Sequence, residues 1–206
     1  MGIEHWDEAK ERWVLYRNQA EHSEDCKAHP YESVPGRIFL DTNVVNLLVD
    51  YSEQIFEHHP LPQFADGALA EDVEALMHVF YVGSRAYWSV LASRKTLDEI
   101  GDTPDATRRD RLRNFAIELI DPEDETNAYA ATVGRRMIDA PFTDGLPDRA
   151  DRELIGNAIG LGCDVFCTRD RRTIVRKREL LRLLPIRVMT PREWWEHVRP
   201  WAGLCM

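Results

Sequence analysis

The sequence predicts an α/β fold: a three-layer α/β/α sandwich around a mostly parallel central sheet, with a helical extension at the N-terminus. Two observations predict it. Short apolar runs of strand type recur along the chain, and longer segments with apolar residues at helical spacing separate them. Because strands that alternate with helices usually pair in parallel through crossover connections, this order indicates one sheet covered by helices.

Size and composition are those of an ordinary globular protein. The 206 residues, 44% apolar and 30% charged, suffice for one sizeable core with an appendage. No apolar run approaches the roughly 20 residues of a membrane-spanning helix. The acidic N-terminus lacks the basic and then apolar order of a signal peptide. The four cysteines are too dispersed for a disulfide framework or a zinc site. We therefore expect a cytoplasmic protein with reduced cysteines and no membrane partner.

The first 35 residues differ from the rest of the chain. Residues 3–20 are rich in charge, with apolar residues at loosely helical spacing, and residues 22–36 contain two prolines among polar residues. We therefore expect a helical extension and linker over residues 1–35 and a main domain over residues 36–206.

The main domain opens with Ile38-Phe39-Leu40, an apolar run typical of a strand buried on both faces, which stops at Asp41. Later segments are assigned by apolar spacing, by turn-forming residues such as those between Pro141 and Pro147, and by cap residues. The elements expected in order are a helix over 44–51, a helix over 71–81, a strand over 87–91, a helix to Ile100 with Ser93 as its N-cap, helices over 106–119 and 124–138, a helix over 149–161 ended by Gly162, a strand over 165–168, a helix over 174–184 and a strand over 186–189.

Two acids follow predicted strands. Asp41 comes directly after the first strand, and Asp170 lies two residues beyond Thr168. Since ligands collect at the carboxyl ends of parallel strands, the two carboxylates are a reasonable start to a metal site. A single aspartate after a strand is more often a turn or helix cap, so each residue alone indicates little.

Asp151 begins the apolar stripe of its predicted helix, which continues through Leu154, Ile155 and Ala158. A carboxylate on a buried stripe is costly without partners, so a cation or a proton donor should meet it. The alternative is an acid that interacts with the helix dipole, although Asp148 is the better cap candidate.

At these positions the sequence resembles the PIN-domain family. The family pattern has a strand ending in Asp-Thr/Ser-Asn/Ser, a glutamate on a mid-domain helix, an aspartate opening a helix of small and aliphatic residues, and a strand ending in Thr-x-Asp. The matching stretches are Ile38 to Val44, Thr96-Leu97-Asp98-Glu99-Ile100, Asp151 to Gly162 and Thr168-Arg169-Asp170. The resemblance covers about residues 36–195. Its most specific part is the last two acids, which lie 19 residues apart. The residues alone do not choose Glu99 over Asp98.

The resemblance implies a PIN sandwich and a metal-dependent endoribonuclease, related to the toxin nucleases of bacterial toxin–antitoxin systems. Its catalytic residues would be Asp41, Glu99, Asp151 and Asp170, which would also bind the metal, Asp41 and Asp170 directly. Hard oxygen ligands favour Mg²⁺ or Mn²⁺. Asn43 and Thr168 would support the ligands or contact phosphate. The expected partners are RNA, an antitoxin or other protein, and a second copy of the chain.

The formal charge of −10 argues at first against a nucleic-acid partner, but the charge is uneven. Between Arg169 and Arg182 the chain has seven basic and two acidic residues. Such a cluster is often only a solvated face. Because it follows Asp170 directly, it predicts RNA backbone contacts from Arg169, Arg171, Arg172 and Arg176. Trp194, Trp195 and Trp201 favour packing over base stacking.

Two rival interpretations remain. A haloacid-dehalogenase-like phosphatase would use Asp41 as nucleophile, but that family needs a second acid where this chain has Asn43. A non-catalytic PIN module that binds RNA or a protein is the stronger alternative. The N-terminal extension and the long loop at 52–70 also depart from the small PIN toxins, which puts a toxin role in doubt.

Overall fold

The computed structural model describes residues 6–7, 12–13, 19–83, 86–146 and 148–204. The chain divides into two compact units. Unit 1 contains residues 1–35, 53–87 and 191–206, and unit 2 contains residues 36–52 and 88–190. The expected start of the main domain at Gly36 coincides with a boundary between the units. The segments 53–87 and 191–206, which were expected in that domain, group with the N-terminal residues instead.

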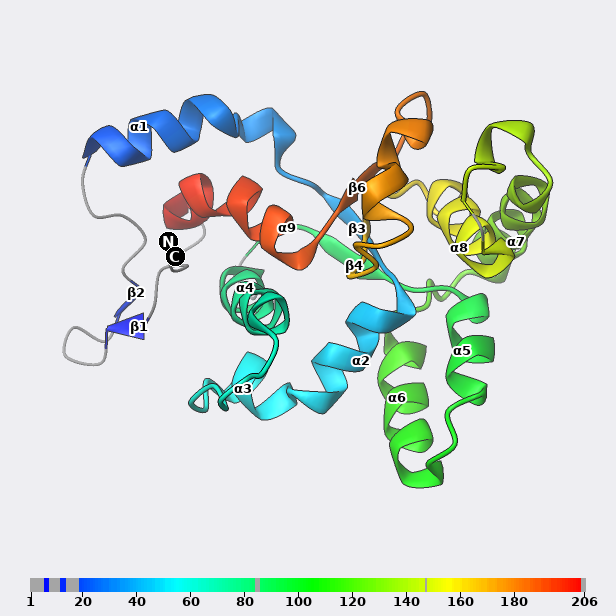
Figure 1. Cartoon of the computed structure of the whole chain (residues 1–206), viewed down its shortest axis with the longest axis horizontal. Helices are drawn as coiled ribbons and strands as arrows, with labels where there is room; N and C mark the ends of the chain where they lie inside the picture. The colour runs from blue at the N-terminus through cyan, green and yellow to red at the C-terminus, as the bar shows by residue number, and fades with distance from the viewer. Residues whose placement is uncertain (1–5, 8–11, 14–18, 84–85, 147, 205–206) are drawn as a thin grey trace. The chain divides into compact units, whose positions relative to one another are not determined.

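Unit 2 is built on a four-stranded parallel sheet, which confirms the α/β class (Figure 1). The strands are β3 (Arg37–Leu40), β4 (Ser89–Leu91), β5 (Val165–Cys167) and β6 (Arg187–Met189). Their order across the sheet is β4-β3-β5-β6. This architecture agrees with the expected three-layer sandwich.

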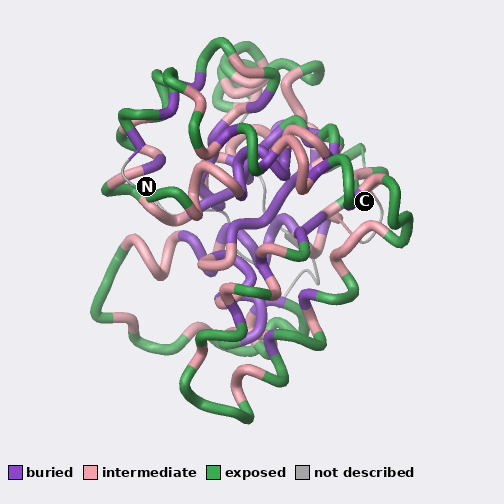
Figure 2. Tube along the Cα trace, turned by 90° about the vertical axis from the view of Figure 1, so that its right-hand side faces the viewer, coloured by how far each residue is buried: buried purple, intermediate pink, exposed green. Residues whose placement is uncertain are grey.

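The strands are mostly apolar because both faces of the sheet are covered. Ile38, Phe39 and Leu40 are all fully buried although successive side chains point to opposite faces. Phe39 pairs in register with Phe166, and their rings stack with centroids 5.5 Å apart. Figure 2 shows the buried stretches, which include these strands, in purple. Val188 of β6 and aliphatic residues of the helix that begins at Arg149 belong to the same core cluster as the two phenylalanines.

The helices of unit 2 follow the sequence-based expectation closely, with one exception. They are α2 (Thr42–Asp50), α5 (Arg94–Gly101), α6 (Ala106–Glu118), α7 (Asp124–Ile138) and α8 (Arg149–Gly160), with a 3₁₀ turn η2 (Pro141–Thr143). Ser93 is the N-cap of α5, and its backbone N–H donates to Thr96 Oγ1 at 3.3 Å. Gly162 ends α8 with a φ of 68°, a conformation that favours glycine.

The exception is the helix expected over 174–184, which is a shorter 3₁₀ segment, η3 (Val175–Leu181). Ile174 and Leu181 are buried, whereas the basic residues Arg176 to Arg178 between them are not. Most of the stability of a helix in a protein comes from packing of its apolar face. This segment buries few apolar side chains, so a regular α-helix is not stabilised there.

Helices α7 and α8 approach closely because glycines line their contact. A Cβ added at Gly156 would lie 2.7 Å from the Cα of Gly134 and 2.8 Å from the Cβ of Met137. One added at Gly160 would lie 2.5 Å from the Cα of Ala130. The two helices therefore meet backbone to backbone, and α8 is held in place with its first turn at the edge of the sheet.

We expect Gly156→Ala to destabilise the protein by about 2–3 kcal/mol, because the added methyl group must push the α7 backbone away. The change is measured as the free energy of unfolding in denaturant. Gly101→Ala is the matched control, since no atom lies within 4 Å of a Cβ placed there, and it should leave stability nearly unchanged. Equal stability of both variants would contradict this account of the helix contact.

Unit 1 contains the segments that depart most from the expected order. Its elements are the strands β1 (Trp6–Asp7) and β2 (Arg12–Trp13), the helices α1 (Gln19–Ala28), α3 (Ser52–Glu57), α4 (Gly67–Gly83) and α9 (Pro191–Val198), and the 3₁₀ turns η1 (Tyr31–Ser33) and η4 (Arg199–Leu204); α3 begins at the last residue of unit 2. A helix over 3–20 was wrong for the described positions, where β1 and β2 pair antiparallel. The remainder of that span up to residue 18 lies outside the described residues. The helix of the extension is α1. It buries none of its residues, so its sequence has no apolar stripe that would predict a helix.

The core of unit 1 lies between α4 and α9. The ring of His78 stacks on that of Trp195 with centroids 4.8 Å apart, and Phe80 meets Trp194 edge to face. Trp194 and Trp195 are buried, which confirms their packing role. Among the helices that the structure describes, none has the length and apolar character needed to cross a membrane.

Candidate functional site

The site lies where the order of the strands reverses. From β3 the chain moves to β4 on one side, and it returns to the other side of β3 as β5. The carboxyl ends of β3 and β5 therefore flank the switch point, the usual ligand position in an open parallel sheet. Asp41 follows β3, and its backbone N–H donates to the carbonyl of Cys167, the last residue of β5, at 3.0 Å. Asp41 and Asp170 are thus brought to one edge.

Asp41 is held by two neutral hydrogen-bond donors. Its carboxylate, only 5% exposed, accepts from Thr168 Oγ1 at 2.5 Å and from Asn43 Nδ2 at 2.5 Å, both at Oδ2. The Asn43 Oδ1 accepts from the backbone N–H of Arg169 at 2.9 Å. Asn43 and Thr168 therefore orient Asp41 and tie β3 to β5.

These donors do not offset the burial of the Asp41 carboxylate. The pKa of Asp41 is raised to about 7, mainly by burial and also by the nearby charge of Glu99, although the hydrogen bond from Thr168 lowers it. A proton or a cation would therefore stabilise the buried Asp41 carboxylate.

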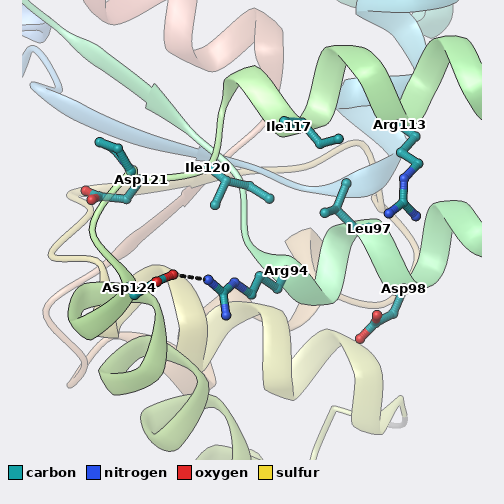
Figure 3. Close-up of a pocket in the computed structure, with 9 residues that line it drawn as sticks. Arg94, Leu97, Asp98, Arg113, Ile117, Ile120, Asp121 and Asp124 are labelled. Carbon is teal, nitrogen blue, oxygen red and sulfur yellow. Dashed lines mark hydrogen bonds and ion pairs between the residues drawn. The ribbon is translucent and has the colours of Figure 1, made fainter.

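Glu99, rather than Asp98, faces this site. Thr42, the first residue of α2, donates its hydroxyl to Glu99 Oε2 at 2.5 Å. Burial raises the pKa of Glu99, while this hydrogen bond and the charge of Lys95 lower it. Asp98 is exposed and lines a separate pocket of about 510 Å³, together with Arg94 and other residues (Figure 3). Adjacent acids on α5 therefore have different surroundings.

Asp151 completes the group. It lies in the first turn of α8 and is half-buried, with Asp148 as the N-cap that accepts from the backbone N–H of Ala150 at 2.8 Å. The pKa of Asp151 is raised to about 7, mainly by burial and then by the charges of Asp41, Asp148, Asp170 and Glu99, in that order. The charges of Asp41, Asp170 and Glu99 therefore all act on Asp151, and the charge of Glu99 also acts on Asp41.

Asp170 stabilises the turn after β5. Its Oδ1 accepts from the backbone N–H groups of Arg172 at 3.0 Å and Thr173 at 2.8 Å, and its Oδ2 accepts from the Thr173 hydroxyl. A carboxylate offers about four acceptor positions, so these contacts leave it able to bind a further group. Asp151 and Asp170 line an open cleft of about 580 Å³ with Asp148, Arg149 and Thr173.

Four residues near the acids were not predicted from the sequence as site residues: Thr42, Asp148, Arg149 and Thr173. Thr42 stands within the Asp-Thr-Asn motif, which was a signal for it. Asp148 was assigned only as a helix cap, yet it also lines the cleft. The exposed side chain of Arg149 pairs with Asp139 at 3.0 Å. No sequence pattern marks Arg149 or Thr173, because only the packing of α8 beside the β5–η3 turn places them in the cleft.

The donor set suits a hard divalent cation. Every acid in the cluster offers oxygen, and the raised pKa values of Asp41 and Asp151 indicate negative charge that their neighbours do not offset. Within the part of the chain that the structure describes, no three acidic, histidine or cysteine side chains form a ready metal-binding group. The acids are thus gathered at one edge without forming a closed set of ligands.

The basic residues beside the cleft have different environments. Arg171, Arg172 and Arg176 are exposed, and Arg169 is half-buried. The first two of these follow Asp170 directly in the sequence. Of the predicted backbone contacts, Arg169 is the least accessible.

Without divalent cations, we expect the melting temperature to fall as the pH rises from about 4 to about 7. The folded-state pKa of Asp151 and of Asp41 is about 7, whereas an aspartate in the unfolded chain has a pKa of 3.8, so protonation stabilises the folded state and this stabilisation is lost across that window. Added Mn²⁺ should raise the melting temperature more at pH 8 than at pH 5, because only ionised carboxylates bind it. Differential scanning fluorimetry measures both effects. A shift with Mn²⁺ that Asp151→Asn leaves unchanged would exclude Asp151 from the site.

The fold and the site define a class: an α/β protein with a cluster of acids at the switch point of a parallel sheet. No family model matches the chain, and no curated protein or solved structure matches it either.

Proposed function

We propose that this chain is a PIN-type endoribonuclease that hydrolyses phosphodiester bonds with Mg²⁺ or Mn²⁺ held by Asp41, Glu99, Asp151 and Asp170. The proposal rests on one observation above all. The charges of the other three acids each raise the pKa of Asp151. Residues separated by up to 129 positions along the chain thus contribute to one electrostatic site.

Each side chain has a defined part in this function. Asp41 and Asp170 provide oxygen ligands from the two strands that flank the switch point. Thr168 and Asn43 hold Asp41 in one orientation, and Thr42 does the same for Glu99. The bound metal would polarise the scissile phosphate and lower the pKa of an attacking water.

The basic surface supplies the affinity for a polyanion. Arg171, Arg172 and Arg176 follow Asp170 and are exposed, so phosphates on either side of the scissile bond can reach them. Arg149 lines the cleft itself and is the nearest candidate to contact a phosphate there. These groups offset the repulsion between the acids and the RNA backbone.

The hydrogen bonds of Asn43 argue against a phosphatase of the haloacid-dehalogenase type. Its amide donates to Asp41 and accepts from Arg169, and an ionised acid at this position could not donate to Asp41. The other alternative is a PIN module that binds RNA without cutting it.

Cleavage of a mixed pool of structured RNAs tests the proposal. The wild-type chain is incubated with EDTA, Mg²⁺ or Mn²⁺, and Asp170→Asn serves as the disabled variant. We expect endonucleolytic products only with metal and only from the wild type. RNA binding without cleavage, together with no thermal shift in Mn²⁺, would support the binding module instead. Cleavage in EDTA would contradict a metal-dependent site.

A further inference from the structure

A second pocket lies in unit 2 between α5, α6 and the turn that leads into α7 (Figure 3). Its volume is about 510 Å³, a size typical of small-molecule sites in proteins. Four apolar and five charged residues line it: Leu97, Ile117, Ile120 and Pro122, and Arg94, Asp98, Arg113, Asp121 and Asp124. The four acids assigned to the nuclease site lie outside this set, so the proposed function leaves the pocket unexplained.

The pocket has two charged ends and an apolar middle. The charged side chains fall at the two ends in Figure 3: Arg94, Asp121 and Asp124 at one, Asp98 and Arg113 at the other. Leu97, Ile117 and Ile120 lie between them. Leu97 and Ile120 are half-buried, and Ile117 is 45% exposed. A ligand that spans the pocket therefore meets aliphatic carbon in the middle and charge at each end.

Asp98 and Arg113 form an end with unpaired charges of both signs. Both side chains are exposed, and neither makes a hydrogen bond or an ion pair with any other residue that the structure describes. An α-ammonium and an α-carboxylate on one carbon complement such an end. The ammonium donates to the aspartate, and the carboxylate accepts from the guanidinium.

The other end has an excess of negative charge. Arg94 donates to Asp124 and so offsets the charge of that acid. The Oδ1 of Asp121 accepts from the backbone N–H of Glu123 at 3.0 Å, and the guanidinium of Arg37 lies 3.9 Å from its Oδ2, beyond hydrogen-bond distance. A carboxylate has about four acceptor positions, so Asp121 can accept from a further cation.

The turn that presents Asp121 is fixed by the buried side chain of Asn127. The Asn127 Nδ2 donates to the carbonyls of Asp121 and Glu123 at 2.7 and 2.9 Å. Directly before the turn, Ile120 forms a parallel bridge with Ala92, the residue after β4. This wall of the pocket is therefore formed before a ligand binds, and binding does not have to order it.

From these observations we infer that the pocket binds a basic α-amino acid, lysine or arginine. Asp98 holds the α-ammonium, Arg113 the α-carboxylate and Asp121 the distal cation, with the methylene chain over the apolar residues between them. Three aspartates and two arginines give the lining one net negative charge, and the ligand has one net positive charge. An aliphatic amino acid would instead place methyl groups against Asp121, and a polyamine would place a cation against Arg113. The inference does not depend on the nuclease proposal.

Isothermal titration of the full chain with L-lysine, L-arginine and three lysine analogues tests the inference. Each analogue lacks one charged group: ε-aminocaproate the α-ammonium, lysinamide the α-carboxylate and norleucine the distal ammonium. Each should bind about tenfold more weakly than lysine, the effect of losing one hydrogen bond between charged groups. An analogue that binds as tightly as lysine would overturn the inference, because one end of the pocket would then take no part in binding. Absence of binding by both amino acids at about 10 mM would also overturn it.

Two variants then locate the ligand. Asp98→Asn should weaken lysine binding about tenfold but leave ε-aminocaproate binding unchanged, because that analogue lacks the group that Asp98 holds. Arg113→Gln should show the same pattern with lysinamide. Asp110→Asn is the matched control, because Asp110 is an exposed acid on α6 outside the pocket lining. Both test variants should melt as the wild type does, since neither side chain has a described partner.

Wild-type affinity for lysine in both Asp98→Asn and Arg113→Gln would overturn the inference. Sedimentation of the same proteins separates this pocket from a contact between copies of the chain. Loss of a dimer in Arg113→Gln, together with unchanged lysine binding, would show such a contact instead of a ligand site.

Discussion

Replacing Asp41 with asparagine is expected to lower the rate of RNA cleavage by about a thousandfold or more. The residue offers a charged oxygen ligand directly after the central strand β3, and asparagine offers a neutral one that binds a divalent cation far more weakly. The asparagine side chain can still accept hydrogen bonds from Thr168 and Asn43, so the fold should survive. Single-turnover cleavage in saturating Mn²⁺ measures the loss.

The same variant should be more stable than the wild type in metal-free buffer at pH 8. Burial raises the pKa of Asp41 to about 7, so above that pH the folded protein holds a buried charge that the unfolded chain holds in water. Removing it should increase the free energy of unfolding by roughly 2 kcal/mol at pH 8, and by little at pH 4. Denaturant titrations at both pH values make the comparison. A variant that loses activity and stability together at pH 8 would mean that Asp41 acts mainly as a structural residue.

Replacing Glu99 with glutamine should reduce cleavage by about 100-fold, whereas Asp98→Asn should retain wild-type activity. Glutamine keeps an oxygen that can accept from Thr42, so the loss reports the charge of Glu99 rather than the packing of α5. Asp98 is the matched control because it is the adjacent acid on the same helix and lines the pocket drawn in Figure 3 instead of the site.

The rates are measured at several Mn²⁺ concentrations. If Glu99 helps to hold the metal, excess Mn²⁺ should restore part of the activity of Glu99→Gln, and the metal concentration for half-maximal rate should rise. Equal losses of activity in Glu99→Gln and Asp98→Asn would mean that Glu99 is not part of the site. Its role would then be limited to accepting the hydrogen bond from Thr42.

Local patterns carried enough information to predict the elements of unit 2. The buried strand Ile38 to Leu40, the stripe behind Asp151 and the cap at Ser93 each depend on side chains near one another in sequence, and each is present. The segment after Asp170 was predicted less well, because whether η3 becomes regular helix depends on contacts with other elements. The helix α1 was missed for a related reason, since it buries no residue and so leaves no periodic signal.

The sequence by itself determined which residues could form a site: acids placed directly after strands or at the start of a helix's apolar stripe. Only the tertiary structure brings their charges close to one another. The order β4-β3-β5-β6 places the ends of β3 and β5 beside each other, and this order depends on crossover connections that no local pattern encodes. It also decided between Glu99 and Asp98, since the direction in which each side chain of α5 points depends on how that helix packs. Residues 53–87 and 191–206 group with the N-terminal segment for the same reason, because the packing of α4 and α9 involves side chains more than 100 positions apart.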